Sequence, residues 1–110
     1  MFQNYFSMKI YISGKITGLP KKEYTRKFHE AGAELTTAFN VAIVQIINPL
    51  DIDPKTPNPT WIDFMAEDIR ELLQCDGIYM LDNWQDSKGA RIEHAIAKEM
   101  GITIKYQNHD

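Results

Sequence analysis

The chain has 110 residues, of which 44% are hydrophobic and 25% charged, and its formal net charge is −3. This composition predicts one soluble globular domain, and the acidic balance argues against a nucleic-acid polymer as the main partner. The sequence has no apolar run as long as a membrane span and no signal-peptide pattern at its start. A single cysteine, Cys75, excludes an internal disulfide, so we expect a cytoplasmic protein.

Strand-like and helix-like segments alternate along the chain. We expect residues 1–7 to form a short N-terminal extension and residues 8–110 to form a single domain. The predicted elements in chain order are strand 9–13, helix 21–39, strand 41–47, helix 61–74, strand 77–81, helix 88–100 and strand 102–106. Strands that alternate with helices imply an α/β fold with a parallel sheet covered on both faces.

Residues 49–59 form the least regular segment, with four prolines and two aspartates in eleven residues. This composition is too polar and too rich in proline for a strand or a helix. A long loop in a small domain is often functional. Two interpretations stay open, a lid over a binding site and a plain connector.

Two carboxylates occupy unexpected positions on the apolar stripes of predicted helices. Glu93 lies three residues before Ile96 and four before Ala97, and Asp68 lies four after Phe64 and four before Leu72. An inward-facing carboxylate is costly unless it is paired or hydrated. Each is therefore part of a structural network or is placed at a cleft for chemistry, and two carboxylates at one cleft are what glycosyl transfer requires.

Glycine-containing segments follow the first strand and precede the last helix. The loop that contains Ser13, Gly14 and Lys15 could cradle a phosphate or a sugar, or it could be only a tight turn. It matches neither the P-loop nor the dinucleotide-binding pattern. The candidate substrate-binding residues at the other segment are Asp82, Asn83, Ser87, Gly89 and Ala90, where Ser87 could bind an anion, cap the helix, or do both.

Two segments carry a resemblance to a known family. KIYISGKITG at 9–18 and CDGIYMLDNWQDSKGARIEHAIAKEMGI at 75–102 together resemble the nucleoside 2-deoxyribosyltransferase-like superfamily, most of all its branch of small bacterial and phage domains. The second segment is the more specific, because a strand, a polar loop, the pair Gly89-Ala90 and then Glu93 follow the family pattern. The resemblance implies a doubly wound, flavodoxin-like sheet of four to five strands and a homo-oligomer.

The resemblance also implies roles for individual residues. Glu93 matches the family's nucleophile, Tyr11 matches an aromatic residue that holds it, and Asp68 matches an aspartate that protonates or orients the leaving base. Ser87 stands where transferases of free nucleosides have aspartate, which is similar to the branch that hydrolyses deoxynucleoside 5′-monophosphates. The neighbouring Asp86 leaves open a shift of one residue.

These observations predict an enzyme that cleaves or transfers the N-glycosidic bond of a 2-deoxyribonucleoside or its 5′-monophosphate through an intermediate on Glu93. The chemistry needs no metal and no other cofactor, and the three histidines show no ligand spacing. Two alternatives stay open. The domain could bind or sense a nucleotide without turnover, or it could cut a ribonucleotide such as a nicotinamide dinucleotide. The base, the sugar and the acceptor also stay open.

Overall fold

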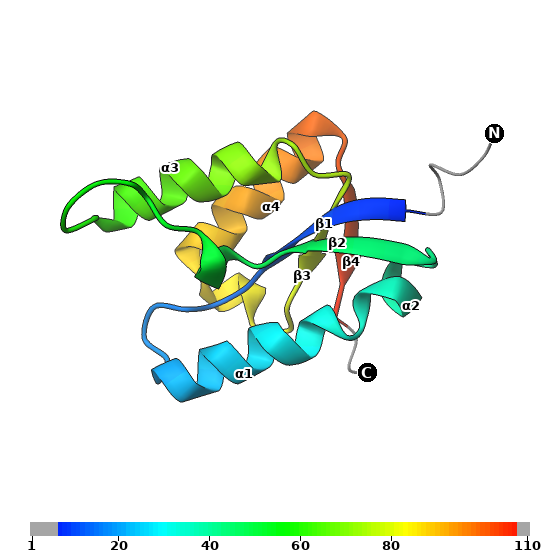
Figure 1. The fold of residues 1–110 in the computed structure, drawn as a ribbon, viewed down its shortest axis with the longest axis horizontal. Coiled ribbons are helices and arrows are strands. Elements are labelled where there is room, and N and C mark those ends of the chain that lie inside the picture. Colours follow the sequence, from blue (N-terminus) through cyan, green and yellow to red (C-terminus); the bar gives the residue numbers. More distant parts are fainter. Residues whose placement is uncertain (1–6, 108–110) are drawn as a thin grey trace.

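The computed structural model describes residues 7–107, which form a four-stranded sheet between two layers of helices (Figure 1). The strands lie in the order β2-β1-β3-β4, and all neighbours are parallel. The elements are β1 (Ser7–Ser13), α1 (Lys21–Gly32), α2 (Leu35–Phe39), β2 (Ile43–Ile47), the 3-10 turn η2 (Pro49–Asp51), α3 (Trp61–Leu72), β3 (Gly77–Met80), the 3-10 turn η3 (Trp84–Asp86), α4 (Lys88–Met100) and β4 (Thr103–Tyr106).

The parallel sheet confirms the predicted α/β, doubly wound, flavodoxin-like fold with helices on both faces. β1 lies at the centre, where Tyr11 pairs with Ile47 of β2 and with Ile78 of β3. Because the strands are parallel, the loops that follow β1 and β3 leave the sheet at the same edge. This edge is where open α/β sheets bind ligands.

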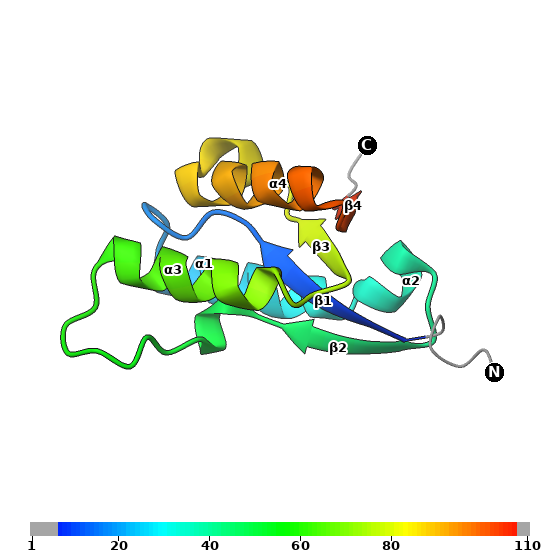
Figure 2. The same ribbon diagram turned by 90° about the horizontal axis from the view of Figure 1, so that it is seen from above.

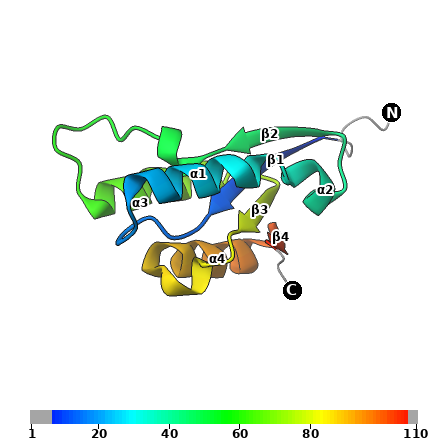
Figure 3. The same ribbon diagram turned by 90° about the horizontal axis from the view of Figure 1, so that it is seen from below.

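Alternate residues of β1 divide the core into two parts, as the pleat of a strand requires. Ile10 and Ile12 pack with α1 and α2 on one face, whereas Tyr11 packs with α3 and α4 on the other. Figures 2 and 3 show the two helical layers from opposite sides of the sheet. The face covered by α3 and α4 therefore receives Tyr11, together with the helices that carry Asp68 and Glu93.

The prediction of one helix over residues 21–39 is wrong, because the chain bends after Gly32 into two helices. At the bend, Glu34 Oε1 accepts a 2.6 Å hydrogen bond from the Tyr79 hydroxyl of β3. The second helix buries Leu35 and Phe39 against the sheet. The apolar spacing runs through the bend without interruption, and the one local signal for it is Gly32, the last residue of α1.

The predicted strand 41–47 begins two residues later, at Ile43, because the preceding residues end α2. Asn40 takes a left-handed conformation with φ 55°, and Val41 N donates a 3.1 Å hydrogen bond to Thr36 O. Ser7, placed in the expected extension, is the first residue of β1 and pairs with Ile43. The rest of that extension, residues 1–6, and the last residues, 108–110, lie outside the described part of the chain.

Side-chain caps determine where α3 and α4 begin. Thr60 and Asp63 form a reciprocal capping box, in which Thr60 N donates to Asp63 Oδ2 at 2.8 Å. Ser87 Oγ accepts from Ala90 N at 3.1 Å. Leu73 and Met100 have the helical spacing of core residues but are exposed, because each lies at the end of its helix where the chain turns toward the next strand.

Candidate active site

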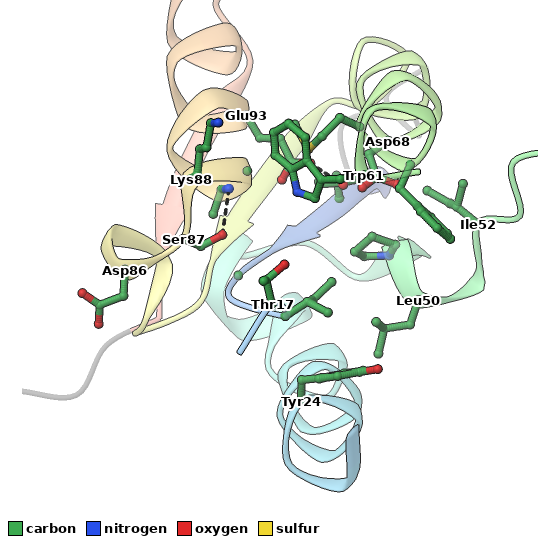
Figure 4. Close-up of a pocket in the computed structure, with 18 residues that line it drawn as sticks. Thr17, Tyr24, Leu50, Ile52, Trp61, Asp68, Asp86, Ser87, Lys88 and Glu93 are labelled. Carbon is green, nitrogen blue, oxygen red and sulfur yellow. Dashed lines mark hydrogen bonds between the residues drawn. The ribbon is translucent and has the colours of Figure 1, made fainter. Parts of the chain in front are cut away.

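A cavity of about 670 Å³ opens at the carboxyl edge of the sheet, between the starts of α1, α3 and α4 (Figure 4). Its size suits a small organic ligand. The residues that line it come from β1, from the segments that follow β1, β2 and β3, and from the helices α1, α3 and α4. They are Tyr11, Gly14, Ile16, Thr17, Tyr24, Pro49, Leu50, Ile52, Trp61, Phe64, Met65, Asp68, Asp86, Ser87, Lys88, Gly89, Ala90 and Glu93.

Glu93 is buried in the cavity wall, with only 5% of its surface exposed. The Tyr11 hydroxyl donates a 2.8 Å hydrogen bond to Oε2, and Ser13 Oγ donates a 2.6 Å hydrogen bond to Oε1. Tyr11 and Ser13 are two residues apart on β1, so they project from the same face of the strand. Both oxygens of the carboxylate are thereby held in a defined orientation by the central strand.

Asp68 projects from α3 into the same cavity and is 9% exposed. Its Oδ1 atom is buried and has no hydrogen-bond partner within residues 7–107. A buried carboxyl oxygen without a partner is unfavourable. The Oδ1 atom of Asp68 is therefore available to hydrogen-bond a polar atom of a bound molecule.

The protein environment shifts the pKa values of Glu93, Asp68 and Tyr11. Burial raises the pKa of Glu93 to about 7, against the opposing effect of its hydrogen bonds from Ser13 and Tyr11. Burial likewise raises the pKa of Asp68 to about 7. Burial, followed by the charge of Glu93, raises the pKa of Tyr11 well above its ordinary value, so the phenol stays protonated and acts as a donor. Two carboxyl groups that exchange protons near neutral pH can perform acid–base chemistry.

Four of the predicted substrate-binding residues line the cavity: Gly14, Ser87, Gly89 and Ala90. The Gly14 backbone approaches Leu81 so closely that a Cβ atom would lie 2.6 Å from Leu81 Cδ1. Ser87 caps α4 at the cavity wall, whereas the carboxylate of Asp86 points away from the centre of the cavity in Figure 4. The polar group presented at this helix start is therefore a hydroxyl and not a carboxylate.

The other four predicted substrate-binding residues, which are Ser13, Lys15, Asp82 and Asn83, do not line the cavity. Ser13 turns toward Glu93. Lys15 N donates a 3.0 Å hydrogen bond to Asn83 Oδ1, which ties the loop after β1 to the loop after β3. Asp82 Oδ1 forms a 3.1 Å ion pair with Lys27 Nζ of α1. These contacts position the loops around the cavity.

An apolar and aromatic wall was missed by the sequence interpretation. Its members are Tyr24 of α1, Leu50 and Ile52 of the proline-rich segment, and Trp61 and Phe64 of α3. Trp61 and Phe64 have the spacing of core residues on α3, yet they are 44% and 40% exposed because they border the cavity. The signal available in the sequence was the proline-rich segment, whose first residues form part of this wall.

The side chains of Lys88 and Trp61 lie next to each other at one side of the cavity (Figure 4). The Lys88 Nζ atom lies 5.1 Å from the centroid of the indole, within the range of a cation–π contact. Within residues 7–107, no group of three His, Cys, Asp or Glu side chains could hold a metal ion. In the same range, no helix is long and apolar enough to cross a membrane.

Comparison with protein families places the chain in a group defined by sequence. The family described as Domain of unknown function (DUF4406) matches residues 8–106. The chain belongs to this family. No curated protein matches the chain. Membership in DUF4406 therefore assigns no activity by itself.

Solved structures with the same fold include two bacterial proteins. A conserved protein from Enterococcus faecalis V583 has a TM-score of 0.62 and 20% identity, over 89% of this chain and 61% of that protein. A 2-deoxyribosyltransferase from Bacillus psychrosaccharolyticus, described as a biocatalyst for nucleoside synthesis, has a TM-score of 0.62 and 15% identity, over 87% of this chain and 69% of that enzyme. The DUF4406 chain thus shares the 2-deoxyribosyltransferase fold and spans about three fifths of the Enterococcus protein.

Proposed function

We propose that this domain cleaves or transfers the N-glycosidic bond of a 2-deoxyribonucleoside or its 5′-monophosphate, with Glu93 as the nucleophile. One observation carries the proposal. A buried carboxylate with both oxygens oriented by the central strand shares an apolar cavity with a second carboxyl group, that of Asp68, whose Oδ1 atom has no partner within residues 7–107. The fold shared with a 2-deoxyribosyltransferase adds support at the level of architecture.

The apolar wall suits the planar base. Trp61 and Phe64 on one side and Tyr24 and Leu50 on the other offer aromatic and aliphatic surface for a nucleobase. In this pose the sugar lies between the base and α4, with its anomeric carbon facing Glu93. Asp68 then lies on the base side of the cavity and can hydrogen-bond a ring nitrogen.

The first step breaks the bond between C1′ and the base nitrogen as a Glu93 oxygen forms a bond to C1′. The electron pair of the broken bond moves to the base, and the proton of the Asp68 carboxyl group neutralises it. In the second step, water or another base attacks C1′, Glu93 leaves as a carboxylate, and the attacking group returns its proton to Asp68. No metal or redox cofactor takes part.

The two carboxyl groups differ in a way that suits these roles. Hydrogen bonds from Tyr11 and Ser13 favour the charged form of Glu93. The Oδ1 atom of Asp68 has no hydrogen-bond partner within the described residues, and burial raises the pKa of Asp68 to about 7, so we assign to Asp68 the role of the protonated group. A charged nucleophile beside a neutral acid is the arrangement that the first step needs.

The start of α4 gives the cavity a site for a phosphate. Ser87, the first amides of the helix and the Lys88 ammonium group lie on one wall of the cavity. A helix N-terminus with a hydroxyl and a cation favours an anion. A 5′-monophosphate is therefore the preferred form of the substrate in this proposal.

The oligomeric state and the location expected from the sequence belong to the same proposal. A chain of 110 residues buries a modest core, and association with further copies would bury more apolar surface. The single buried thiol, Cys75, fits a reducing cytoplasm. Size-exclusion chromatography with light scattering would test the homo-oligomer.

The decisive experiment incubates the protein with a panel of deoxynucleosides, deoxynucleoside 5′-monophosphates and nicotinamide dinucleotide, and follows released base by chromatography. Glu93→Gln keeps the shape of the side chain and should abolish release. Glu99→Gln, an exposed glutamate on the same helix, is the matched control and should behave as the unmodified protein.

Each outcome has a defined meaning. Release of a base that requires Glu93 supports the proposal, and release of nicotinamide alone would move the activity to the ribonucleotide alternative. Activity that survives Glu93→Gln would exclude Glu93 as the nucleophile. Thermal stabilisation by a nucleotide without release of any base would favour a binding or sensing module.

A further inference from the structure

Ser13 is the last residue of β1 and is 1% exposed, so it is out of reach of a bound ligand. Its hydroxyl donates a 2.6 Å hydrogen bond to Glu93 Oε1, and it does not line the cavity. This differs from the substrate-binding role that the sequence suggested. A buried serine whose hydroxyl donates to Glu93 Oε1 and does not reach the cavity has no evident function in binding a substrate.

Burial and the charge of Asp68 work against the ionised form of Glu93. The titratable side chains that line the cavity beside it are Tyr11 from β1, Tyr24 from α1, Asp68 from α3, Asp86 from η3 and Lys88 from α4. β3 presents the apolar Ile78 and Met80 to this face. β4 presents Ile104 and also Tyr106, whose hydroxyl lies 2.7 Å from His94 Nε2 of α4. Burial is the largest influence on the pKa of Glu93 and raises it, the charge of Asp68 raises it further, and the hydrogen bonds from Ser13 and Tyr11 lower it.

We propose that Ser13 is a positioning residue, which keeps Glu93 ionised near neutral pH and directs its Oε2 atom toward the substrate. The inference rests on the function proposed above. Tyr11, which binds Oε2, lines the cavity, whereas Ser13, which binds Oε1, does not. Oε2 is therefore the oxygen on the cavity side and Oε1 the oxygen on the strand side.

This division assigns a role to each oxygen during the reaction. Oε2 forms the bond to C1′ as the base departs with the electron pair of the broken bond. Oε1 becomes the carbonyl oxygen of the glycosyl ester, and Ser13 continues to donate a hydrogen bond to it. When water attacks C1′, Oε2 leaves and the negative charge returns to the carboxylate. The Ser13 hydrogen bond then strengthens, because a charged acceptor binds a donor more tightly than a neutral one.

The test compares Ser13→Ala, Ser13→Cys and a matched control, Ser7→Ala, at an exposed serine on the same strand. The first removes the donor and the second keeps a weak one in similar volume. Two quantities are measured for each variant. One is the pH dependence of kcat and KM for base release, and the other is the titration of the Glu93 carboxyl carbon by nuclear magnetic resonance.

In Ser13→Ala we expect the acidic limb of kcat and the Glu93 titration to move together by about one pH unit toward higher pH, which is about a tenfold loss of kcat below the limb. KM should not change. The kcat limb and the Glu93 titration of Ser13→Cys should lie between those of Ser13→Ala and those of the unmodified protein. Both quantities should be unchanged in Ser7→Ala. A purely structural role would lower the amount of folded protein without moving either titration.

Two results would overturn the inference. One is an unchanged Glu93 titration in folded Ser13→Ala. The other is a rise in KM with kcat unchanged, which would mean that Ser13 contacts the substrate. Because the resonance titration needs no turnover, a protein that releases no base can still show the effect of Ser13. In that case the proposed activity fails and the link between Ser13 and the ionisation of Glu93 stands.

Discussion

Tyr11 and Glu93, which are 82 residues apart in the chain, are joined by a buried hydrogen bond of 2.8 Å. The bond forms because β3 lies directly beside β1, and α4, which follows β3, packs on the face that receives Tyr11. The orientation of the candidate nucleophile therefore depends on the central strand of the sheet. A carboxylate held by the buried end of β1 retains its position when exposed loops move.

Tyr11→Phe removes only the hydroxyl group of a fully buried side chain. We expect the pKa of Glu93 to rise, because a hydrogen bond to its charged form is lost. Base release at neutral pH should fall roughly tenfold, and the free energy of unfolding should fall by about 1–2 kcal/mol. Rate measurements across pH and urea denaturation would check both. A variant with an unchanged pH–rate profile would contradict a role for Tyr11 in holding Glu93.

The stability of the protein should depend on pH through Asp68 and Glu93. Burial raises the pKa of each carboxyl group to about 7 in the folded state, whereas the pKa values in the unfolded state are about 4. Folding therefore favours the protonated forms. The stability that they contribute is fully present below about pH 4, is lost as the pH rises to about 7, and changes little above that.

We expect the free energy of unfolding to fall by roughly 3 kcal/mol across that window, less than full conversion of both shifts because the cavity is open to water. Urea denaturation at a series of pH values measures the change. The double variant Asp68→Asn, Glu93→Gln should flatten the profile, while Glu99→Gln on the exposed face of α4 should leave it intact. An equal slope in the double variant and the unmodified protein would assign the pH dependence to other groups.

Gly14→Ala should destabilise the domain by about 1–3 kcal/mol. The added Cβ atom would lie 2.6 Å from Leu81 Cδ1 and 2.8 Å from Leu81 Cγ, and Leu81 is fully buried and cannot move aside freely. Gly32→Ala is the control, since its Cβ atom would lie 3.3 Å from the flexible end of Ile46. Chemical denaturation gives the free energy of unfolding of both variants. If Gly14→Ala loses no more of it than Gly32→Ala, the loop after β1 adjusts to the added Cβ atom at no cost.

Ser87→Asp tests the phosphate preference. Aspartate caps a helix as well as serine, so the free energy of unfolding should change little. Its negative charge would lie beside the start of α4, where it should repel a 5′-phosphate. We expect kcat/KM for a deoxynucleoside 5′-monophosphate to fall about tenfold or more relative to the free deoxynucleoside. An unchanged ratio would place the phosphate elsewhere in the cavity or outside it.

Local signals in the sequence determined much of this protein. Alternating strands and helices predicted the parallel sheet, and Thr60 and Ser87 marked the starts of α3 and α4 through their capping side chains. Asp68 and Glu93 stood out as carboxylates on apolar stripes, and both are buried. These features depend on residues within one or two turns of each other, which is the range over which helix periodicity and capping operate.

Tertiary contacts decided the rest. At the bend after α1, Glu34 accepts a hydrogen bond from Tyr79 of β3, and at the end of β1, Ser13 donates one to Glu93 of α4. Trp61 and Phe64 have the spacing of core residues, yet they border a cavity because no other element fills the space beside them. The spacing of apolar residues shows which side of a helix faces inward. Whether that side meets another side chain or an open cavity is set by segments far away in the chain, and so only the folded structure reveals it.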